Sequence, residues 1–206
     1  MNRIHRELII LITGLLILSI QVDGQTFKGG ISGGFTTTQI DGDNWGGFNK
    51  LGLHAGGYVF TELNKYLKAQ FEIRYVGKGA TSGFNIQNST FAVNSLNYIE
   101  FPVSLNVLYG DKYIIEAGIY EGFLLYRYVY DESGVLNAND NDEYKRLDTG
   151  LFGGLGYKIS EKLDFRVRYS YSLFKIRELD YFQIKWLRTI NGEYNNVISM
   201  GLYYEI

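Results

Sequence analysis

The chain has 206 residues and a formal net charge of −2, with 18 tyrosines, 25 glycines, one proline and no cysteine. The lack of cysteine excludes disulfides, thiol chemistry, a lipid-modified amino-terminal cysteine and thiolate metal sites, and the near-neutral charge gives no general attraction to nucleic acid. The tyrosine and phenylalanine content favours strands, and abundant glycine without proline is not the composition of a disordered chain.

The first 24 residues have the composition of a secretory signal peptide. Two arginines precede the apolar stretch Leu8–Ile20, and Val22 and Gly24 suit the small-residue positions before a cleavage site. The apolar stretch is short for a membrane span, and an uncleaved anchor helix is the alternative. We therefore expect a signal peptide over residues 1–24 and one mature domain over residues 25–206.

Eight segments of the mature domain have the alternation of apolar and polar residues that indicates strands, and no amphipathic helix pattern is convincing there. The fourth segment, for example, places Ile99, Phe101 and Val103 on one face and Glu100 on the other. The predicted strands are Phe27–Thr36, Leu51–Thr61, Leu67–Gly77, Asn97–Tyr109, Lys112–Tyr126, Thr149–Ile159, Leu163–Phe174 and Asn195–Ile206.

Short and long connections alternate strictly between these segments. In an antiparallel meander this order places every short turn at one end and every long loop at the other, which is typical of a transmembrane barrel. Tyrosines on the apolar faces near strand ends fit the aromatic girdles of such barrels. The sequence therefore predicts an all-β fold, an eight-stranded antiparallel up-and-down transmembrane β-barrel of the outer-membrane type.

Two positions interrupt the alternation. Pro102 stands within the fourth segment and cannot donate a ladder hydrogen bond, so we expect a bulge there, or a lumen water or side chain that takes the orphaned carbonyl. Glu121 follows Ile119 on the outward face of the fifth segment. Either a bulge near Tyr120 resets the phase, or the strand has left the lipid by that point.

The stretch Tyr98–Val103 (YIEFPV), the stretch Phe152–Leu173 (FGGLGYKISEKLDFRVRYSYSL), the signal peptide and the strand number carry a family resemblance. The chain resembles the PorT-type, porin-family outer-membrane β-barrels of Bacteroidetes-like bacteria. The resemblance implies an outer-membrane location, insertion by the barrel assembly machinery, contact with outer-membrane lipid and lipopolysaccharide, and no defined activity. The secretion role of the namesake does not transfer. Such barrels usually end in an aromatic residue, whereas this chain ends in Ile206, with Tyr204 two residues before it.

Charged residues share the face that an apolar outer wall would turn toward the lumen. Because side chains alone fill the interior of an eight-stranded barrel, we expect these charges to pair in a structural polar network that plugs the lumen. The predicted network comprises Lys28, Glu72, Arg74, Glu100, Glu116, Arg166 and Arg168.

The last long connection mixes aromatic and basic residues, which indicates a contact surface for surface glycan, lipopolysaccharide or a partner protein. The alternative is that the last two strands simply extend above the membrane as a ribbon. The predicted surface comprises Tyr181, Phe182, Lys185, Trp186 and Arg188.

No catalytic, cofactor or metal site is predicted. The one histidine of the mature domain, His54, points inward by alternation, so a nucleophile at the lipid-facing rim would lack its base. The acidic and amide residues of segment 137–143 lack the glycine that a calcium loop requires. The glycines of segment 29–34 precede neither Lys-Ser/Thr nor a helix, so we interpret them as lumen-face residues that allow curvature, not as a phosphate loop.

We therefore predict a plugged, non-catalytic outer-membrane barrel that serves envelope structure or binds through its extracellular loops. A structural subunit of an envelope or secretion complex is the alternative. A lipid-modifying barrel enzyme and a soluble lipocalin-like barrel, whose apolar face would line a ligand cavity, are less favoured.

Overall fold

The structure is a computed structural model that describes residues 26–43, 45–82, 91–131, 134–137, 144–185 and 188–206. Within these ranges, side chains are not described at residues 131, 135–137, 179–185 and 188–191. The predicted signal peptide lies outside the described residues. In the part of the chain that the structure describes, no helix has the length and hydropathy needed to cross a membrane.

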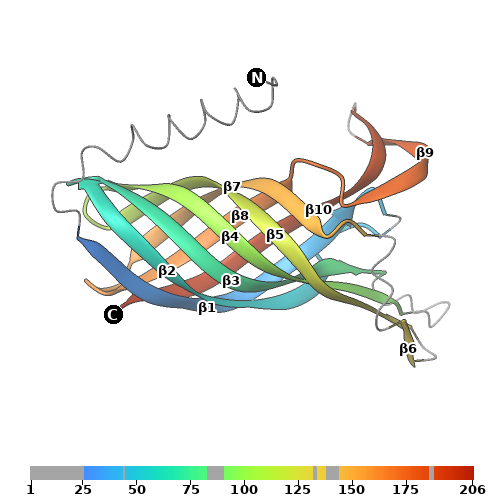
Figure 1. The fold of residues 1–206 in the computed structure, drawn as a ribbon, viewed down its shortest axis with the longest axis horizontal. Coiled ribbons are helices and arrows are strands. Elements are labelled where there is room, and N and C mark those ends of the chain that lie inside the picture. The colour runs from blue at the N-terminus through green and yellow to red at the C-terminus, as the bar shows by residue number, and fades with distance from the viewer. Residues whose placement is uncertain (1–25, 44, 83–90, 132–133, 138–143, 186–187) are drawn as a thin grey trace, which may run out of the picture.

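The described residues form ten strands in one sheet (Figure 1). All neighbouring strands are antiparallel, and β1 also pairs with β10 over twelve residue pairs, which closes eight of the strands into a barrel. Short β6 pairs with β5, and β9 pairs with β10, outside this closed ring. The strands are β1 (Phe27–Asp41), β2 (Lys50–Asn64), β3 (Leu67–Thr81), β4 (Val93–Tyr109), β5 (Tyr113–Asp131), β6 (Gly134–Asn137), β7 (Leu147–Lys158), β8 (Leu163–Ser172), β9 (Arg177–Lys185) and β10 (Arg188–Glu205). The predicted closed eight-stranded antiparallel barrel is confirmed.

The two ends of the barrel differ. Short turns join β2 to β3, β4 to β5 and β7 to β8 at one end, where the carboxyl terminus also lies, and β6 and β9 project from the other end (Figure 1). In the β4–β5 turn, Gly110 and Asp111 both have φ of 60°, the left-handed conformation that tight hairpin turns favour in Gly, Asn and Asp. We call these the turn end and the loop end.

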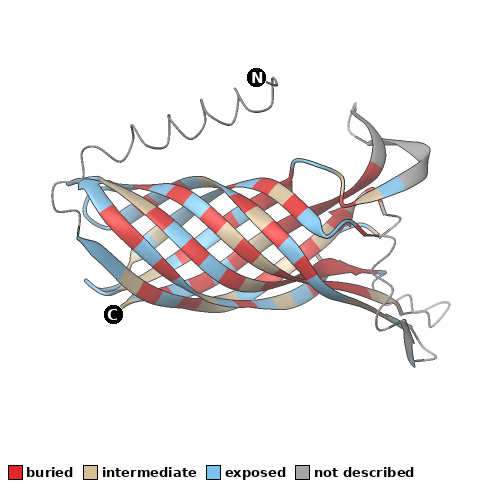
Figure 2. Ribbon diagram, in the orientation of Figure 1, coloured by how far each residue is buried: buried red, intermediate tan, exposed pale blue. Residues whose placement is uncertain are grey.

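Burial alternates along the strands over the middle and turn-end part of the barrel, whereas the loop ends of β3, β4 and β10 are buried on both faces (Figure 2). The outward side chains are apolar and exposed, as for Leu51 (79%) and Val103 (50%), whereas the fully buried ones include Arg74, Lys78 and Glu100. A soluble barrel has the opposite distribution, with its apolar face inside. This barrel therefore presents a hydrocarbon surface to its surroundings, as a transmembrane barrel does, and the lipocalin-like alternative is wrong.

The strands extend further at the loop end than the sequence predicts. β1 continues to Asp41 rather than Thr36, β5 to Asp131 rather than Tyr126, and β10 begins at Arg188 rather than Asn195. Beyond the apolar belt the outward residues are no longer regularly apolar and the inward ones no longer regularly polar, so the alternation that reveals a strand in the sequence fades although the backbone pairing continues.

Pro102 leaves a gap in the ladder, and the predicted bulge there is wrong. The β3–β4 register runs through Phe71–Val103 and Arg74–Glu100 without a shift, but no pairs form at the two positions between them. On its other side, Pro102 pairs with Tyr120 of β5. The missing N–H therefore costs local pairing with β3 and leaves the strand geometry unchanged.

The phase of β5 continues through Glu121, which excludes the first of the two alternatives, a bulge near Tyr120. The β4–β5 register shifts later, between Asn97 and Tyr98, where Leu125 is the extra residue. Glu121 thus faces outward between Ile119 and Phe123, and it accepts a hydrogen bond from Thr149 Oγ1 at 2.6 Å.

Glycines on the inward face allow backbone and large side chains to approach each other. A Cβ at Gly34 would overlap the backbone at Met200 and Gly201 and the imidazole of His54, and a Cβ at Gly150 would overlap the Tyr120 ring. Not all glycines of segment 29–34 face the lumen as predicted, since Gly29 and Gly33 lie on the outward face.

We expect Gly34→Ala to destabilise the barrel by about 1–3 kcal/mol or more, because the added methyl group overlaps fixed backbone atoms. Gly33→Ala is the matched control, since its Cβ would lie 3.7 Å from the nearest atom, the carbonyl oxygen of His54. Urea unfolding in detergent micelles, followed by heat-modifiable gel mobility, measures both. Equal stability of the two variants would contradict this packing account.

Candidate functional site

Two ion-pair clusters occupy the lumen, and the cluster nearer the loop end is centred on Glu100. Arg74 donates to Glu100 Oε2 from Nε at 2.9 Å and from Nη2 at 2.7 Å. Lys78 Nζ lies 2.6 Å from Glu100 Oε1 and 2.7 Å from Asp148 Oδ2. Each of these four side chains is at most about 1% exposed, and each has an opposite charge in contact. We call this set the upper cluster.

Polar and aromatic side chains complete the upper cluster. Ser172 Oγ donates to Asp148 Oδ1 at 2.6 Å and Asn195 Nδ2 donates to Asp148 Oδ2 at 2.8 Å. The Lys78 ammonium also lies 4.4 Å from the ring centroid of Tyr120 and 4.9 Å from that of Tyr98, a distance at which cation–π attraction operates. The charge of Lys78 is thus compensated on several sides.

The second set, the lower cluster, lies toward the turn end and is centred on Glu116. Arg168 donates to Glu116 from Nε at 2.6 Å and to Glu72 from Nη2 at 2.6 Å. Arg166 donates from Nη1 to Glu116 at 3.2 Å and from Nη2 to Asp164 at 2.9 Å. Strands β3, β5 and β8 supply these groups, because each places alternate residues in the lumen.

The structure brings six of the seven predicted network residues into these two clusters, and it places Lys28 elsewhere. Lys28 is inward by alternation, but it stands one residue after the start of β1, at the turn-end rim. Its side chain is 44% exposed and pairs with Glu62 at 3.4 Å and Glu205 at 3.5 Å. Alternation predicts the face that a residue occupies but not its height along the barrel.

Sequence reasoning missed Lys78 and Asp148, because both fall in segments predicted as long loops. A signal for Lys78 was present: it lies two residues after Val76 and four after Arg74, so a continued strand places all three inward. Asp148 begins the inward face of β7, where the preceding residues give no periodic pattern.

Tyr144 connects strand ends at the loop end of the barrel. Its hydroxyl donates to Glu193 Oε2 of β10 at 2.5 Å and accepts from Asn94 Nδ2 of β4 at 2.8 Å. The Arg127 and Arg177 guanidinium groups lie 4.7 and 5.5 Å from its ring centroid. Burial and the neighbouring Glu193 carboxylate raise the pKa of Tyr144, so the hydroxyl stays a donor at neutral pH. We call these five residues the Tyr144 brace.

An apolar layer lies between the brace and the upper cluster. Tyr144 packs with buried side chains of β1, β3, β4 and β5, and Trp45 lies against the same group. The members of this layer are Ile40, Ala80, Leu96, Tyr98, Leu124, Tyr144 and Ile176. The lumen thus changes from ionic to apolar before it reaches the loops.

Two further buried groups face the lumen. His54 is 2% exposed, with Nε2 3.3 Å from the Met200 carbonyl oxygen. Lys50, at the loop end of β2, is 7% exposed, and no carboxylate among the described residues lies within ion-pair distance of it. Lys50 is therefore a buried cation without a described counter-charge, a second feature that sequence reasoning missed.

The structure does not describe the side chains of the predicted loop contact surface. Trp186 lies outside the described residues, and the side chains of Tyr181, Phe182, Lys185 and Arg188 are not described. The backbone here forms the β9–β10 ribbon, in which Lys185 pairs with Arg188. The acidic residues 138–143 considered for calcium also lie outside the described residues.

The chain matches the family described as outer membrane protein beta-barrel domain over residues 24–178. It belongs to this family. The protein is therefore an outer-membrane β-barrel, which makes the turn end periplasmic and the loop end extracellular. Comparison with curated proteins gives no match.

Solved outer-membrane barrels share the fold. Neisserial surface protein A superposes with a TM-score of 0.52 at 10% identity, covering 89% of this chain and 100% of that chain. Ail, the attachment invasion locus protein of Yersinia pestis, superposes with a TM-score of 0.51 at 11% identity, with the same coverage. A structure of Ail in complex with the heparin analogue sucrose octasulfate matches with a TM-score of 0.50. At such identities the likeness establishes the fold alone.

We expect Glu100→Gln to lower the free energy of unfolding by about 3–5 kcal/mol, because buried Arg74 would lose its ion pair with Glu100 and Lys78 would keep only its pair with Asp148. Glu62→Gln is the control, since its ion pairs at the exposed rim are worth at most about 1 kcal/mol. Urea titration monitored by far-UV circular dichroism in detergent compares them. A stability loss no larger than that of the control would show that the upper cluster does not hold the lumen together.

Proposed function

We propose that this outer-membrane barrel neither conducts solutes nor catalyses a reaction, and that it acts by binding an anionic saccharide at its extracellular end. The observation that carries the proposal is the combination of a lumen filled by paired charges with strands that continue well past the membrane. β4, β5 and β10 have 17, 19 and 18 residues, whereas a crossing needs about 9–11.

A closed lumen is supported by the packing of the two ion-pair clusters. Arg168 of β8 reaches Glu72 of β3 and Glu116 of β5, and Lys78 of β3 reaches Asp148 of β7. Arg168 and Lys78 are at most about 2% exposed. Cavities beside Arg166 at the periplasmic end measure about 20 and 30 Å³, room for single water molecules and not for a solute.

The absence of catalysis is supported by the position of the one histidine of the domain. His54 is buried in the lumen, so it has no access to a lipid substrate at either rim. The charged groups of the upper and lower clusters form ion pairs with each other. Neither arrangement leaves a base beside an accessible nucleophile.

The extracellular end has the features of a preorganised binding surface. The Tyr144 brace joins Tyr144, just before β7, to the extracellular ends of β4, β9 and β10, so these described segments hold one arrangement. Lys145 and Arg146 follow Tyr144 and are exposed, and Lys50 adds a buried positive charge without a described counter-charge. Rigid placement of cations favours an anionic ligand and lowers the entropy cost of binding it.

Sulfated or phosphorylated saccharide is the ligand class that fits this surface. The likeness to Ail, which was solved with a heparin analogue, adds support at the level of the fold. Lipopolysaccharide, with its phosphate and acidic sugar groups, lies at the same height in the outer leaflet. The predicted aromatic and basic surface of β9 and β10 would extend the same site. Membership of the PorT-type group within the family remains a prediction from the sequence motifs.

A subunit of an envelope complex is a second candidate, and one observation favours it. Glu121 places a carboxylate on the apolar outer wall, where Oε1 is buried and has no hydrogen-bond partner among the described residues. A polar contact from another membrane protein would satisfy that atom. Co-purification in mild detergent distinguishes a complex subunit from a barrel that acts alone.

Purified protein inserted into planar lipid bilayers is expected to give no single-channel conductance steps, because paired side chains fill the lumen from the lower cluster to the apolar layer. A large general porin, inserted under the same conditions, is the positive control for recording. Reproducible steps from the folded protein would contradict the closed lumen.

The double variant Lys145→Gln/Arg146→Gln is expected to bind a sulfated heparin oligosaccharide and purified lipopolysaccharide about fivefold more weakly, about 1 kcal/mol. The effect should shrink at high salt, since exposed charges are screened. Surface plasmon resonance with detergent-solubilised protein measures it. Lys112→Gln/Lys162→Gln, with the same charge change at exposed periplasmic turn residues, is the control. Equal loss in both variants would exclude a site at the extracellular end.

A further inference from the structure

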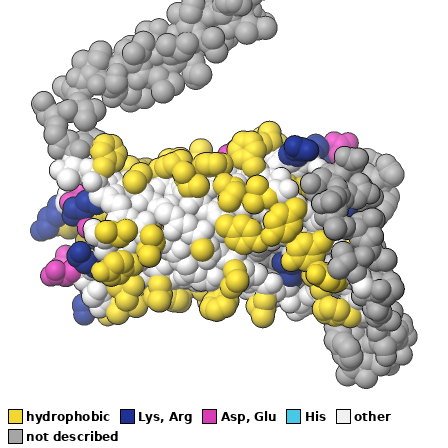
Figure 3. Space-filling view, turned by 60° about the horizontal axis from the view of Figure 1, so that its bottom comes forward, with side chains coloured by type: hydrophobic (Ala, Val, Ile, Leu, Met, Phe, Trp, Pro, Cys, Tyr) yellow, Lys and Arg dark blue, Asp and Glu magenta, His cyan; other side chains and the backbone are white. Residues whose placement is uncertain are grey.

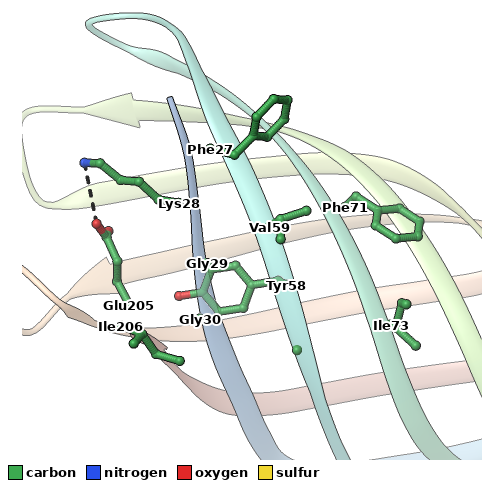
Figure 4. A pocket seen from close by; sticks show the side chains of 11 residues that line it. Phe27, Lys28, Gly29, Gly30, Tyr58, Val59, Phe71, Ile73, Glu205 and Ile206 are labelled. Carbon is green, nitrogen blue, oxygen red and sulfur yellow. Dashed lines mark ion pairs between the residues drawn. The ribbon is translucent and has the colours of Figure 1, made fainter. Parts of the chain in front are cut away.

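A groove of about 770 Å³ opens on the outer wall of the barrel over β1, β2 and β3 (Figure 4). Phe27, Val59, Phe71 and Ile73 form its sides, and each is at least about 39% exposed. The carboxyl-terminal Ile206 lies beside it. The groove has the volume of a small-molecule site, yet it faces the membrane rather than water.

Outward glycines form the floor of the groove, and the backbone does not require them. A Cβ at Gly57 would lie 3.7 Å from the nearest atom, and one at Gly29 would lie 3.5 Å from it, both ordinary contact distances. Neither residue has the positive φ that favours glycine. By contrast, the inward Gly30 and Gly56 next to them have no room for a Cβ. Glycine weakens a strand, so Gly29 and Gly57 lower the stability of β1 and β2, and the packing of these strands does not explain why glycine stands there.

The surface of the barrel shows how unusual this area is. Figure 3 shows hydrophobic side chains on either side of a broad area in which none is seen, and charged groups near the two ends. Phe27 and Ile206 mark the periplasmic side of the groove, and Ile73 its side toward the middle of the wall. The groove therefore lies beside the inner leaflet of the outer membrane.

Charges of both signs stand at the periplasmic end of the groove. Lys28 and Glu205 line it and pair with each other at 3.5 Å (Figure 4). Glu62 pairs with Lys28 at 3.4 Å and with Lys68 at 3.4 Å. These side chains are between 23% and 50% exposed, so they can exchange partners at low cost.

We propose that this groove holds one acyl chain of an inner-leaflet phospholipid with an ammonium headgroup, of the phosphatidylethanolamine class. The acyl chain lies over Gly57 and Gly29 between the apolar sides. The phosphate meets Lys28, and the headgroup ammonium meets Glu205 and Glu62. The groove is apolar along its length and has adjacent opposite charges at its periplasmic end. This order matches the order of groups along a zwitterionic phospholipid.

The position and the charges favour this occupant over the others. Lipopolysaccharide occupies the opposite leaflet. In its usual form it carries no ammonium group that could pair with the carboxylates of Glu205 and Glu62. A second copy of the chain would need apolar side chains to fill the groove, and it would leave Lys28, Glu62 and Glu205 without a role. The inference is independent of the proposed saccharide binding, because the two sites lie at opposite ends of the barrel.

The test compares Gly57→Leu with Gly153→Leu by native mass spectrometry of protein titrated with phosphatidylethanolamine in non-ionic detergent. Gly153 is the matched control: it is an outward, exposed glycine of β7, and its Cβ would also lie 3.7 Å from the nearest atom. We expect Gly57→Leu to retain about tenfold less lipid and Gly153→Leu to behave as the unaltered chain. Heat-modifiable gel mobility verifies folding, and Gly29→Leu provides a second groove variant.

The headgroup assignment is tested in the same experiment. Phosphatidylglycerol, which has the acyl chains and phosphate but no ammonium, is expected to bind more weakly than phosphatidylethanolamine, and Lys28→Gln is expected to lower retention of both. Equal retention by all glycine variants would overturn the groove site. A dimer that Gly57→Leu abolishes would overturn the lipid assignment in favour of a second copy.

Discussion

The pairing of β1 with β10 is the constraint on which the rest of this protein depends. Inside a bilayer no water satisfies free backbone groups, so a sheet can cross only if it has no edge. Twelve residue pairs close that edge. Closure then separates two environments, because every strand turns alternate side chains to the lipid and to a space too narrow for bulk water. The apolar wall and the ionic lumen both follow from this separation.

Charge in such a lumen is stable only when it is paired, and the two clusters show how the pairing is distributed. The carboxylate of Glu100 contacts two cations of β3, and that of Glu116 contacts two cations of β8. Lys78 of β3 then reaches Asp148 of β7, and Arg168 of β8 reaches Glu72 of β3. The cross-barrel contacts hold strands together that are not neighbours, which is a role apolar side chains fill in a soluble core. A rigid barrel in turn gives the extracellular strand extensions a fixed base, and the Tyr144 brace joins the extensions of β4, β5, β9 and β10 to one another.

The barrel fold and the lumen face of most charged residues could be predicted from the sequence, because both depend on local alternation along each strand. The period of two along a strand follows from backbone geometry, so alternation correctly placed Glu72, Arg74 and Glu100 on the lumen face. Partners could not be predicted, because Glu72 and Arg168 are 96 residues apart and meet only through the stagger of the closed barrel. Lys78 and Asp148 were missed because hydrophobic periodicity ends where the membrane ends. The groove was missed because its floor is formed by outward glycines, which have no side chain to mark a face in the alternation pattern.

The distribution of the lower cluster along the chain also bears on how the barrel assembles. Glu72 arrives with β3, but Arg168 arrives only with β8. An insertion route that delivered one hairpin at a time into lipid would hold that carboxylate without its counter-ion until the barrel was almost complete. Electroneutrality of the lumen and closure of the ring are therefore achieved in the same step. Assembly should accordingly be all-or-none, with the early hairpins kept out of the hydrocarbon until the last strands are in place.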